Sequence, residues 1–277
     1  MTQHTRCAAL AASLMILTAG PGLAVDALPG LEGRALVSIH DGDMLASAYV
    51  NGQLGPQESE DALSVLSLND LTLATVPVSN SVAGAPTAVA VTPDGRFALV
   101  SESFGPRRPG GETFRDLTPG GALTVVDISD PAAPVVVGET EVGARPDGLS
   151  ISAEGDMVAV ALHQSDGRGI AFVPLSEGAL GSVSYASLPA IDASQRISHV
   201  EWHPSDDVVA IHTVDQATIH FGRVVRGEDG VTLVPHGNAV LTSKYPFMGR
   251  FTPDGRHYVT SNLYWGPDVV GIWTEAP

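Results

Sequence analysis

The chain has 277 residues, of which 44% are hydrophobic, so it is long enough to bury a sizeable core. It carries 31 acidic residues against 14 basic ones, which gives a formal net charge of −17 at pH 7. This charge opposes binding to nucleic acid or to an anionic membrane through a basic patch, and a solubilising surface is its simplest explanation.

Residues 1–24 have the pattern of a secretory signal peptide. Arg6 supplies a positive charge, an apolar run covers residues 7–19, and Gly22-Leu23-Ala24 offers small residues for cleavage. The run is too short to predict a membrane span, and a buried N-terminal helix is the alternative interpretation. We therefore expect a periplasmic or secreted protein, with residues 25–277 forming one domain and no membrane span after signal removal. Cys7 is the single cysteine and would leave with the signal, so no disulfide is expected.

Five stretches of the chain predict β-hairpins. The strongest is Val89–Ser101, where apolar residues alternate with period 2 on both sides of Pro93-Asp94-Gly95. In such a turn proline presets φ, aspartate bonds to the backbone, and glycine accepts positive φ. Related stretches lie at His40–Ala46, Ile151–Val160, Trp202–Ile211 and Phe251–Thr260. Their turn residues, 49 to 60 positions apart, are Gly42, Gly95, Gly155, Asp206 and Gly255.

Two more strand-like runs separate consecutive hairpins, so each repeat holds four short strands. The first set of runs covers residues 63–68, 123–128, 170–175 and 218–224, and the second covers 73–78, 135–142, 183–188 and 231–240. Four-stranded units repeated about every 50 residues are typical of propeller blades. We therefore predict an all-β fold, a β-propeller of four-stranded blades with about five visible. A β-sandwich is the alternative, although a sandwich would not repeat the same turn motif at a constant spacing along the chain.

The repeat sequence resembles that of YVTN-type and lactonase-like β-propellers. The stretches that carry the resemblance are Pro86–Val100 and Pro146–Gly155, and Asn262 matches the asparagine that ends the second hairpin strand. Many unrelated propellers share this hairpin, so it implies a fold more than a function. Members of the family usually have seven blades. The chain is therefore expected to be either a five-bladed ring or a fragment of a seven-bladed propeller, incomplete after Val269–Trp273.

The longest irregular segment is Phe104–Gly121, which is expected between the third and fourth strands of the second repeat. Loops of this length are often functional. It gathers three arginines of an otherwise acidic chain, Arg107, Arg108 and Arg115, and is a candidate for contact with an anionic group. A surface insertion without function is the alternative.

Hairpin geometry places the start of each first strand and the end of each second strand at one end of the sheet. The residues expected on this face are Arg145, Asp147, Arg196, Ser198, His199, Tyr245, Glu102, His163, Thr213 and Asn262. Such groups can bind a carboxylate or a phosphorylated sugar and can move a proton. The catalytic candidates are His199, Glu102 and His163, and the ligand-binding candidates are Arg145, Arg196, Arg107, Arg108 and Asn262. The resemblance implies a His/Arg/Glu group in the central channel, but no residue matches it one to one. Each candidate also has a structural interpretation as an ion pair, a packed side chain or a loop cap.

The sequence contains no motif that is specific for a metal or cofactor site, so none is predicted. His199 and His203 share a strand face but are about 13 Å apart at strand rise, too far for one metal ion. Calcium is a weaker expectation at two acidic turns, Asp41-Gly42-Asp43 and Asp127–Asp130, which more often cap turns.

Two classes of function follow from these patterns. The first is an exported binding or scaffold propeller that takes a protein or small ligand on one face. The alternative is a lactonase-like hydrolase in which arginine anchors an anion and histidine or glutamate activates water. A weaker alternative is a quinoprotein dehydrogenase subunit, which would need a partner that carries the cofactor.

Overall fold

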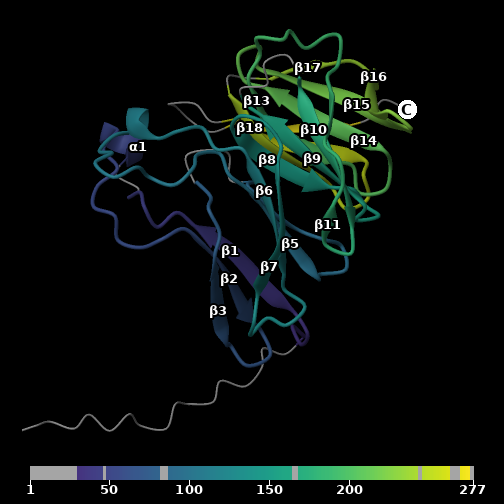
Figure 1. Ribbon diagram of the computed structural model, residues 1–277. Helices are drawn as coiled ribbons and strands as arrows, with labels where there is room; N and C mark the ends of the chain where they lie inside the picture. Colours follow the sequence, from purple (N-terminus) through teal and green to yellow (C-terminus); the bar gives the residue numbers. More distant parts are fainter. Residues whose placement is uncertain are drawn as a thin grey trace, which may run out of the picture.

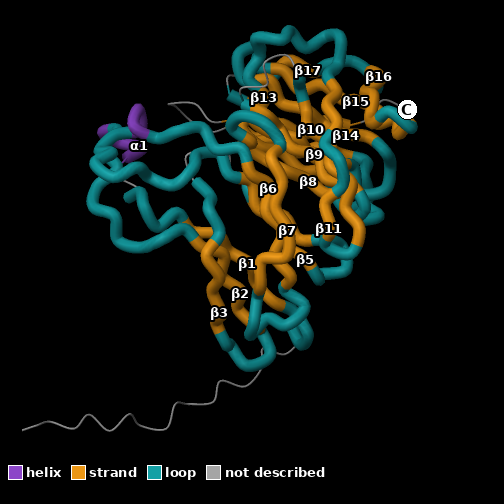
Figure 2. Tube along the Cα trace, viewed as in Figure 1, coloured by secondary structure: helices purple, strands orange, loops and turns teal. Residues whose placement is uncertain are grey.

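The structure is a computed structural model that describes residues 30–45, 48–81, 87–163, 168–242, 245–262 and 269–274. These residues form five antiparallel sheets that follow one another along the chain (Figure 1). Helix is confined, in this described part, to α1 (Ala48–Asn51) and a short 3-10 helix over Phe114–Asp116 (Figure 2). The all-β prediction is therefore confirmed. The predicted signal peptide lies outside the described residues and stays a prediction.

The sheets follow the predicted repeat. The first holds β1 (Ala35–His40), β2 (Ala62–Ser67) and β3 (Leu73–Pro77), and the second holds β4 (Val89–Val91), β5 (Phe97–Ser101), β6 (Ala122–Asp127) and β7 (Val135–Glu141). The third holds β8 (Pro146–Ile151), β9 (Met157–Leu162), β10 (Ile170–Ser176), β11 (Ala179–Leu180) and β12 (Ser184–Ala186). The fourth holds β13 (Ile197–Trp202), β14 (Val208–Thr213), β15 (Thr218–Gly227), β16 (Gly230–Pro235) and β17 (Val240–Leu241). The fifth holds β18 (Pro246–Phe251), β19 (His257–Asn262) and β20 (Val269–Thr274).

Each sheet is one blade of a propeller. The first strands of neighbouring blades contact one another, β4 with β8, β8 with β13, and β13 with β18. The blade β1–β3 lies at one end of the molecule and the fourth blade at the other, and the sheets do not close into a ring (Figure 1). The predicted propeller class is thus confirmed as an open arrangement of blades.

The hydrophobic core lies between the blades rather than in one centre. Leu99 and Val160 belong to a cluster shared by the second and third blades, and Phe172 and Ile211 to one shared by the third and fourth. Because both faces of a middle blade are covered, strands β9 and β14 are buried along their whole length. A fully buried valine or isoleucine contributes about 1.5–3 kcal/mol, so these interfaces supply most of the stabilisation.

Threonine and serine side chains stabilise the hairpin turns through hydrogen bonds. In the β4–β5 turn, Thr92 Oγ1 donates to Asp94 Oδ1 at 2.5 Å and accepts from the Phe97 N–H at 3.0 Å. Gly95 adopts φ +74° in this turn, a conformation that glycine accepts without strain. The same bonds recur at Thr252 with Asp254 and at Ser152 with Asp156. The four predicted hairpins after residue 88 are therefore confirmed.

The first predicted hairpin, at His40–Ala46, is wrong. Strand β1 ends at His40 and pairs with β2, and Gly42 does not have positive φ. The turn residue of this repeat is instead Gly33, which has φ +71°. The residue after it, Arg34, has a carbonyl that accepts from the Leu68 N–H at 2.9 Å. The Arg96 carbonyl accepts from Ile128 in the same way and at the same distance. Strand β1 thus corresponds to β5, and the first blade has three strands within the described residues rather than four.

The two ends of the blades form two faces. We call the end with the turns 92–96, 152–156, 203–207 and 252–256 the turn face, and the opposite end the loop face. The loop face holds the long connections 41–61 and 102–121, which pack together through Leu54, Phe114 and Leu117. No helix in the described part of the chain has the length and apolar character needed to cross a bilayer.

Candidate functional site

A β-bulge at the start of β8 shapes the loop face. Pro146 pairs with Leu162 and Gly148 with Ala161, so Asp147 has no partner across the strand pair. Bulges commonly change the direction of a side chain at the edge of a sheet. Arg145, just before this bulge, has φ +58°, and its carbonyl accepts from the His163 N–H at 2.9 Å. The backbone therefore brings Arg145, Asp147 and His163 together.

The side chains of these three residues form one polar group. His163 Nδ1 lies 2.6 Å from Asp147 Oδ2, and Arg145 Nε lies 3.5 Å from Asp147 Oδ1. A carboxylate only accepts, so Nδ1 carries the proton that it donates to Asp147, and Nε2 is the acceptor whenever the ring is neutral. The Asp147 side chain is 4% exposed, whereas those of Arg145 and His163 are 21% and 12% exposed.

Arg145 keeps donors available for a ligand. Its guanidinium lies over the Phe104 ring at 4.6 Å, which fixes its plane by a cation–π contact. Within the described residues, its terminal amino groups make no hydrogen bond. A planar guanidinium held in this way can bind a carboxylate or phosphate through two parallel hydrogen bonds.

A second ion pair lies on the same face. Arg196 NH2 donates to Asp215 Oδ1 at 2.5 Å, and Arg196 Nε also contacts this carboxylate at 3.0 Å. The hydrogen bond from Arg196 lowers the pKa of Asp215. Both side chains are more than a third exposed, so the pair lies at the surface. Arg196 is thus engaged, unlike the terminal groups of Arg145.

A cavity of about 540 Å³ is lined by Gly143 and Ala144, the two residues that precede Arg145 in the chain. Its lining includes Glu102, Glu141, Arg168 and Tyr185, together with the backbone of Gly120-Gly121. Glu102 Oε2 accepts from the Gly121 N–H at 3.1 Å, and both glycines pass so close to Glu102 and Glu141 that a Cβ would clash. The Arg168 guanidinium lies 4.9 Å from the centre of the Tyr185 ring. The cavity thus offers acceptors, a cation and an aromatic face within reach of one small molecule.

The structure places the other predicted residues in different surroundings. Arg107 donates to the carbonyls of Asp43, Gly55 and Gly111, so it braces the two long loops against each other. Arg108 is exposed in the same segment, and Asn262 is buried at the end of β19. None of these three joins the group around Arg145.

His199 does not reach the loop face, contrary to the expectation from strand position. Its ring is fully buried, with Nδ1 3.1 Å from Thr87 Oγ1 and Nε2 2.8 Å from the Gly249 carbonyl. The neighbouring His212 is also fully buried, and its Nε2 lies 2.7 Å from the Tyr258 hydroxyl. Burial lowers the pKa of both histidines, that of His212 to about 4. These residues link the fourth blade to the second and fifth blades.

Sequence reasoning missed the partners that complete the loop face. Glu141, Arg168 and Tyr185 lie in strands or connections without a motif, and Asp215 follows the end of β14. The position of Asp215 is the one usable signal, because it lies two residues beyond Thr213, which was expected on this face.

One group of carboxylates has the arrangement of a possible metal site. The oxygens of Asp41, Asp43 and Asp61 lie within 4.8 Å of one another. Burial raises the pKa of Asp61, and the charge of Asp43 adds to this effect. Oxygen ligands suit calcium. Asp127 and Asp130 form no such group in the described part of the chain. Calcium at the first turn stays a prediction.

Comparisons with known proteins support the fold alone. No protein-family model matches the chain, and no curated protein matches it. A solved protein from Lactobacillus plantarum is similar to it with a TM-score of 0.54 and 16% identity, covering 78% of this chain and 64% of the other. The β-propeller domain of Cps50 (Swd1) from Myceliophteria thermophila gives 0.52 and 14%, with coverages of 81% and 66%. A protein from Bacteroides uniformis, provisionally assigned as a 6-phosphogluconolactonase, gives 0.51 and 16%, with coverages of 73% and 57%. The chain thus spans less than two thirds of each of these structures, and the likeness shows a propeller fold.

Proposed function

We propose that the protein is a propeller that binds a small anionic ligand on its loop face, at Arg145, Asp147 and His163. The observation that carries this proposal is the guanidinium of Arg145, held over Phe104 with its terminal donors unused within the described residues. Asp147 and His163 fix its surroundings, and the cavity with Arg168 and Tyr185 has room for the body of the ligand. Sugar acids and sugar phosphates are the ligands whose chemistry fits these groups best.

Calorimetric titration of the purified protein with glucose 6-phosphate and gluconate tests this proposal. For whichever of the two ligands binds the parent protein more tightly, we expect the Arg145→Met variant to bind at least tenfold more weakly, because a bidentate contact is lost. Arg256→Met is the matched control, since Arg256 is exposed on the turn face. Equal affinities for the protein and its Arg145→Met variant would contradict the proposal, and so would no binding of either ligand.

Hydrolysis of a lactone is a second candidate function, and the His163–Asp147 pair favours it. With Nδ1 held by Asp147, the Nε2 atom of His163 would accept a proton from water as its oxygen attacks the lactone carbonyl. The ring C–O bond then breaks, and the imidazolium returns the proton to the leaving alkoxide. The similarity in fold to the protein from Bacteroides uniformis is consistent with this chemistry.

Hydrolysis of glucono-δ-lactone, corrected for the spontaneous reaction, tests the enzymatic candidate. A His163→Gln variant should lose at least 100-fold in kcat, whereas Arg145→Met should mainly raise KM. Circular dichroism of both variants checks that the fold is kept. If His163→Gln keeps full activity, or if the protein has none, the hydrolytic function is excluded while the binding function stands.

A further inference from the structure

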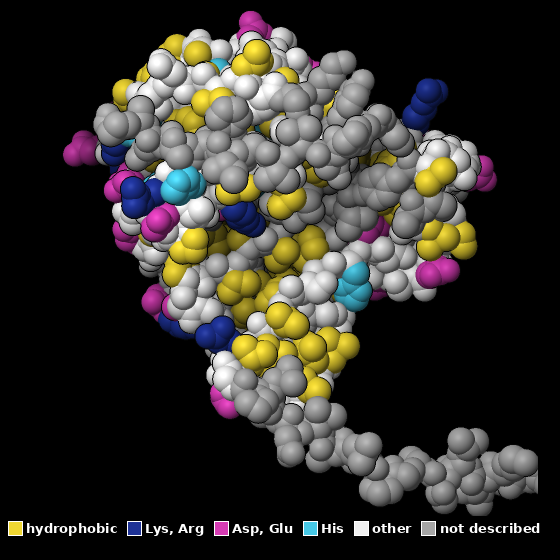
Figure 3. Space-filling view, turned by 180° about the vertical axis from the view of Figure 1, so that it is seen from behind, with side chains coloured by type: hydrophobic (Ala, Val, Ile, Leu, Met, Phe, Trp, Pro, Cys, Tyr) yellow, Lys and Arg dark blue, Asp and Glu magenta, His cyan; other side chains and the backbone are white. Residues whose placement is uncertain are grey.

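A second cavity lies on the turn face, and none of the residues that line it belongs to the group around Arg145. Its volume is about 1050 Å³, and residues of β1, β4, β8, β13 and β18 line it. Ligand pockets typically measure about 300–1,000 Å³, so the cavity is large enough for one small molecule. From behind, apolar side chains gather in a hollow near the centre of the molecule (Figure 3). This cavity is separate from the proposed loop-face site.

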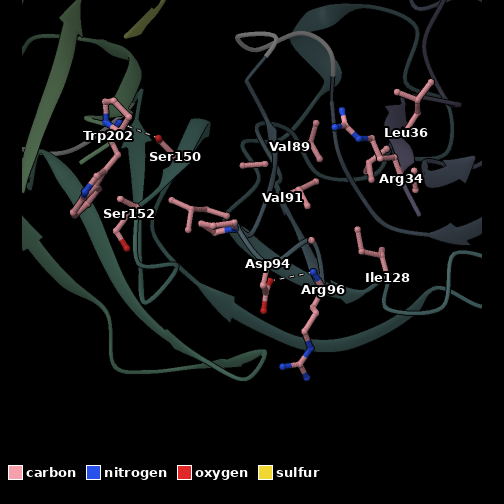
Figure 4. Close-up of a pocket in the computed structure, with 18 of the residues that line it drawn as sticks. Arg34, Leu36, Val89, Val91, Asp94, Arg96, Ile128, Ser150, Ser152 and Trp202 are labelled. Carbon is pink, nitrogen blue, oxygen red and sulfur yellow. Dashed lines mark hydrogen bonds between the residues drawn. The ribbon is translucent and has the colours of Figure 1, made fainter. Parts of the chain in front are cut away.

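Apolar side chains contribute about half of the surface that lines this cavity. They include Leu36, Val89, Val91, Ile128 and Ile151 from three blades. Leu36 is 57% exposed and Val91 is 40% exposed, so each leaves apolar surface in water. In Figure 4, Arg34 and Leu36 lie on one side of the space, and Ser150 and Trp202 lie on the other. An apolar body placed between these walls would cover surface that is otherwise hydrated.

Arg34 gives the cavity a free cation. Its guanidinium points toward Val89 across the space (Figure 4), and its side chain makes no hydrogen bond or ion pair within the described residues. Arg250 lines the cavity from β18, in the fifth blade. Its NH1 donates to Glu201, and its side chain is 52% exposed. Arg96 differs from both, since its guanidinium points away from the space and pairs with Glu177.

The acidic groups of the cavity are already bonded. Glu201 is held by Arg250, and Asp94 accepts from Thr92 and from the Arg96 N–H. Arg34 therefore gives this cavity a positive charge without an acidic partner among the described residues, whereas the chain as a whole has a net charge of −17. Arg34 is exposed at the edge of the cavity, and an arginine without an acidic partner is complementary to an anion.

From these observations we propose that the turn-face cavity binds an amphiphilic anion, with an apolar body between Leu36 and Ile151 and a carboxylate or sulfonate on Arg34. This site is a second one, independent of the loop-face ligand. Its chemistry differs from that of a sugar acid, because the walls offer apolar surface where a sugar needs hydrogen-bond partners.

Fluorescence titration with a matched pair of dyes tests the proposal. The first dye is 8-anilinonaphthalene-1-sulfonate, and the second is N-phenyl-1-naphthylamine, which has the same apolar body without the sulfonate. We expect Arg34→Gln to weaken binding of the sulfonate at least tenfold and binding of the neutral dye less than twofold. Arg256→Gln is the control, because Arg256 is exposed on the same face outside the cavity, and both affinities should stay within twofold.

A second variant keeps the test decisive if Arg34→Gln does not fold. Leu36→Glu places a negative charge on the exposed wall, and we expect it to weaken the sulfonate at least tenfold while the neutral dye still binds. Near-UV circular dichroism of each variant checks that the fold is kept. Equal effects on both dyes, no effect on the sulfonate in a folded variant, or loss of sulfonate binding in Arg145→Met would each overturn the proposal.

Discussion

Three histidines show how two regions of the molecule differ: His163 lies on the loop face, whereas His199 and His212 lie in the interior between the blades. On the loop face, His163 is partly exposed and contacts the Asp147 carboxylate at 2.6 Å. In the interior, His199 and His212 are fully buried and bond to neutral groups, a threonine, backbone carbonyls and a tyrosine. The nearest carboxylate oxygen to His199 is that of Glu201, at 3.9 Å.

This difference separates residues suited to proton transfer from residues that hold blades together. A buried imidazole without an ionic partner stays neutral, because burial penalises its charged form. The interior group therefore contributes hydrogen bonds and packing, including an edge-to-face contact between the His199 and His212 rings at 4.9 Å. His163, with a carboxylate on Nδ1 and some contact with solvent, has the surroundings of a general base.

Removing His199 should have the largest effect on stability. In a His199→Ala variant, Thr87 Oγ1 and the Gly249 carbonyl lose their partner and a cavity forms, so we expect a loss of about 3–4 kcal/mol. Urea unfolding followed by tryptophan fluorescence measures it. The matched change on the loop face, His163→Ala, should cost less, about 1–2 kcal/mol, because the ring is partly exposed and its removal takes one donor from the buried Asp147 carboxylate. Equal losses would remove the distinction between the two regions.

The pH dependence of stability should report the interior histidines. The pKa of His212 falls from 6.5 to about 4 on folding, so between these values the unfolded chain binds more protons than the folded one. The free energy of unfolding therefore decreases as pH falls below about 6.5, and His212 alone should remove about 2 kcal/mol by pH 5. Burial raises the pKa of Glu201, which acts in the opposite direction and partly offsets this loss.

Urea unfolding at pH 7.5 and pH 5 measures this dependence. A His212→Gln variant, which keeps a polar side chain, should lose less stability between the two pH values than the parent protein does. An unchanged slope in His212→Gln would show that the buried ring is not the group that titrates.

An interior carboxylate that is paired with an arginine extends the comparison. Arg250 on β18 pairs with Glu201 on β13, whose side chain is 10% exposed. In Arg250→Met this carboxylate stays buried without its cation, so we expect a loss of about 2 kcal/mol at pH 7.5. Glu201 would take up a proton more readily in the variant, so the deficit should shrink as pH falls toward 5. Urea unfolding at both pH values measures it, and a deficit that grows in acid would contradict this account.

The repeat could be predicted because its turns follow local chemistry. Thr92, Asp94 and Gly95 form their hydrogen bonds and positive φ within five residues, so the sequence pattern alone predicts the hairpin. Gly33 was missed because its turn lacks the Pro-Asp that precedes Gly95 and Gly255, although Gly33-Arg34 matches Gly95-Arg96.

The site was only partly predictable, because its contacts depend on how blades pack. Strand position correctly brought Arg145 and His163 to one face, since both lie at ends of the β8–β9 hairpin. The same reasoning misplaced His199, because in a propeller both faces of a first strand can be covered by neighbouring blades. The bulge that leaves Asp147 unpaired has no signature in period-2 alternation.

The smallest effect is expected from the exposed ion pair of the loop face. Arg196 and Asp215 are 42% and 38% exposed, so water stabilises each charge when its partner is lost. Arg196→Met should therefore cost less than about 0.5 kcal/mol, although its hydrogen bonds are as short as those of Arg250. Urea unfolding in 0.05 M and 0.5 M salt measures this cost, which should vanish at the higher concentration because salt screens exposed charges. A loss as large as that of Arg250→Met would show that burial is not what distinguishes the two regions.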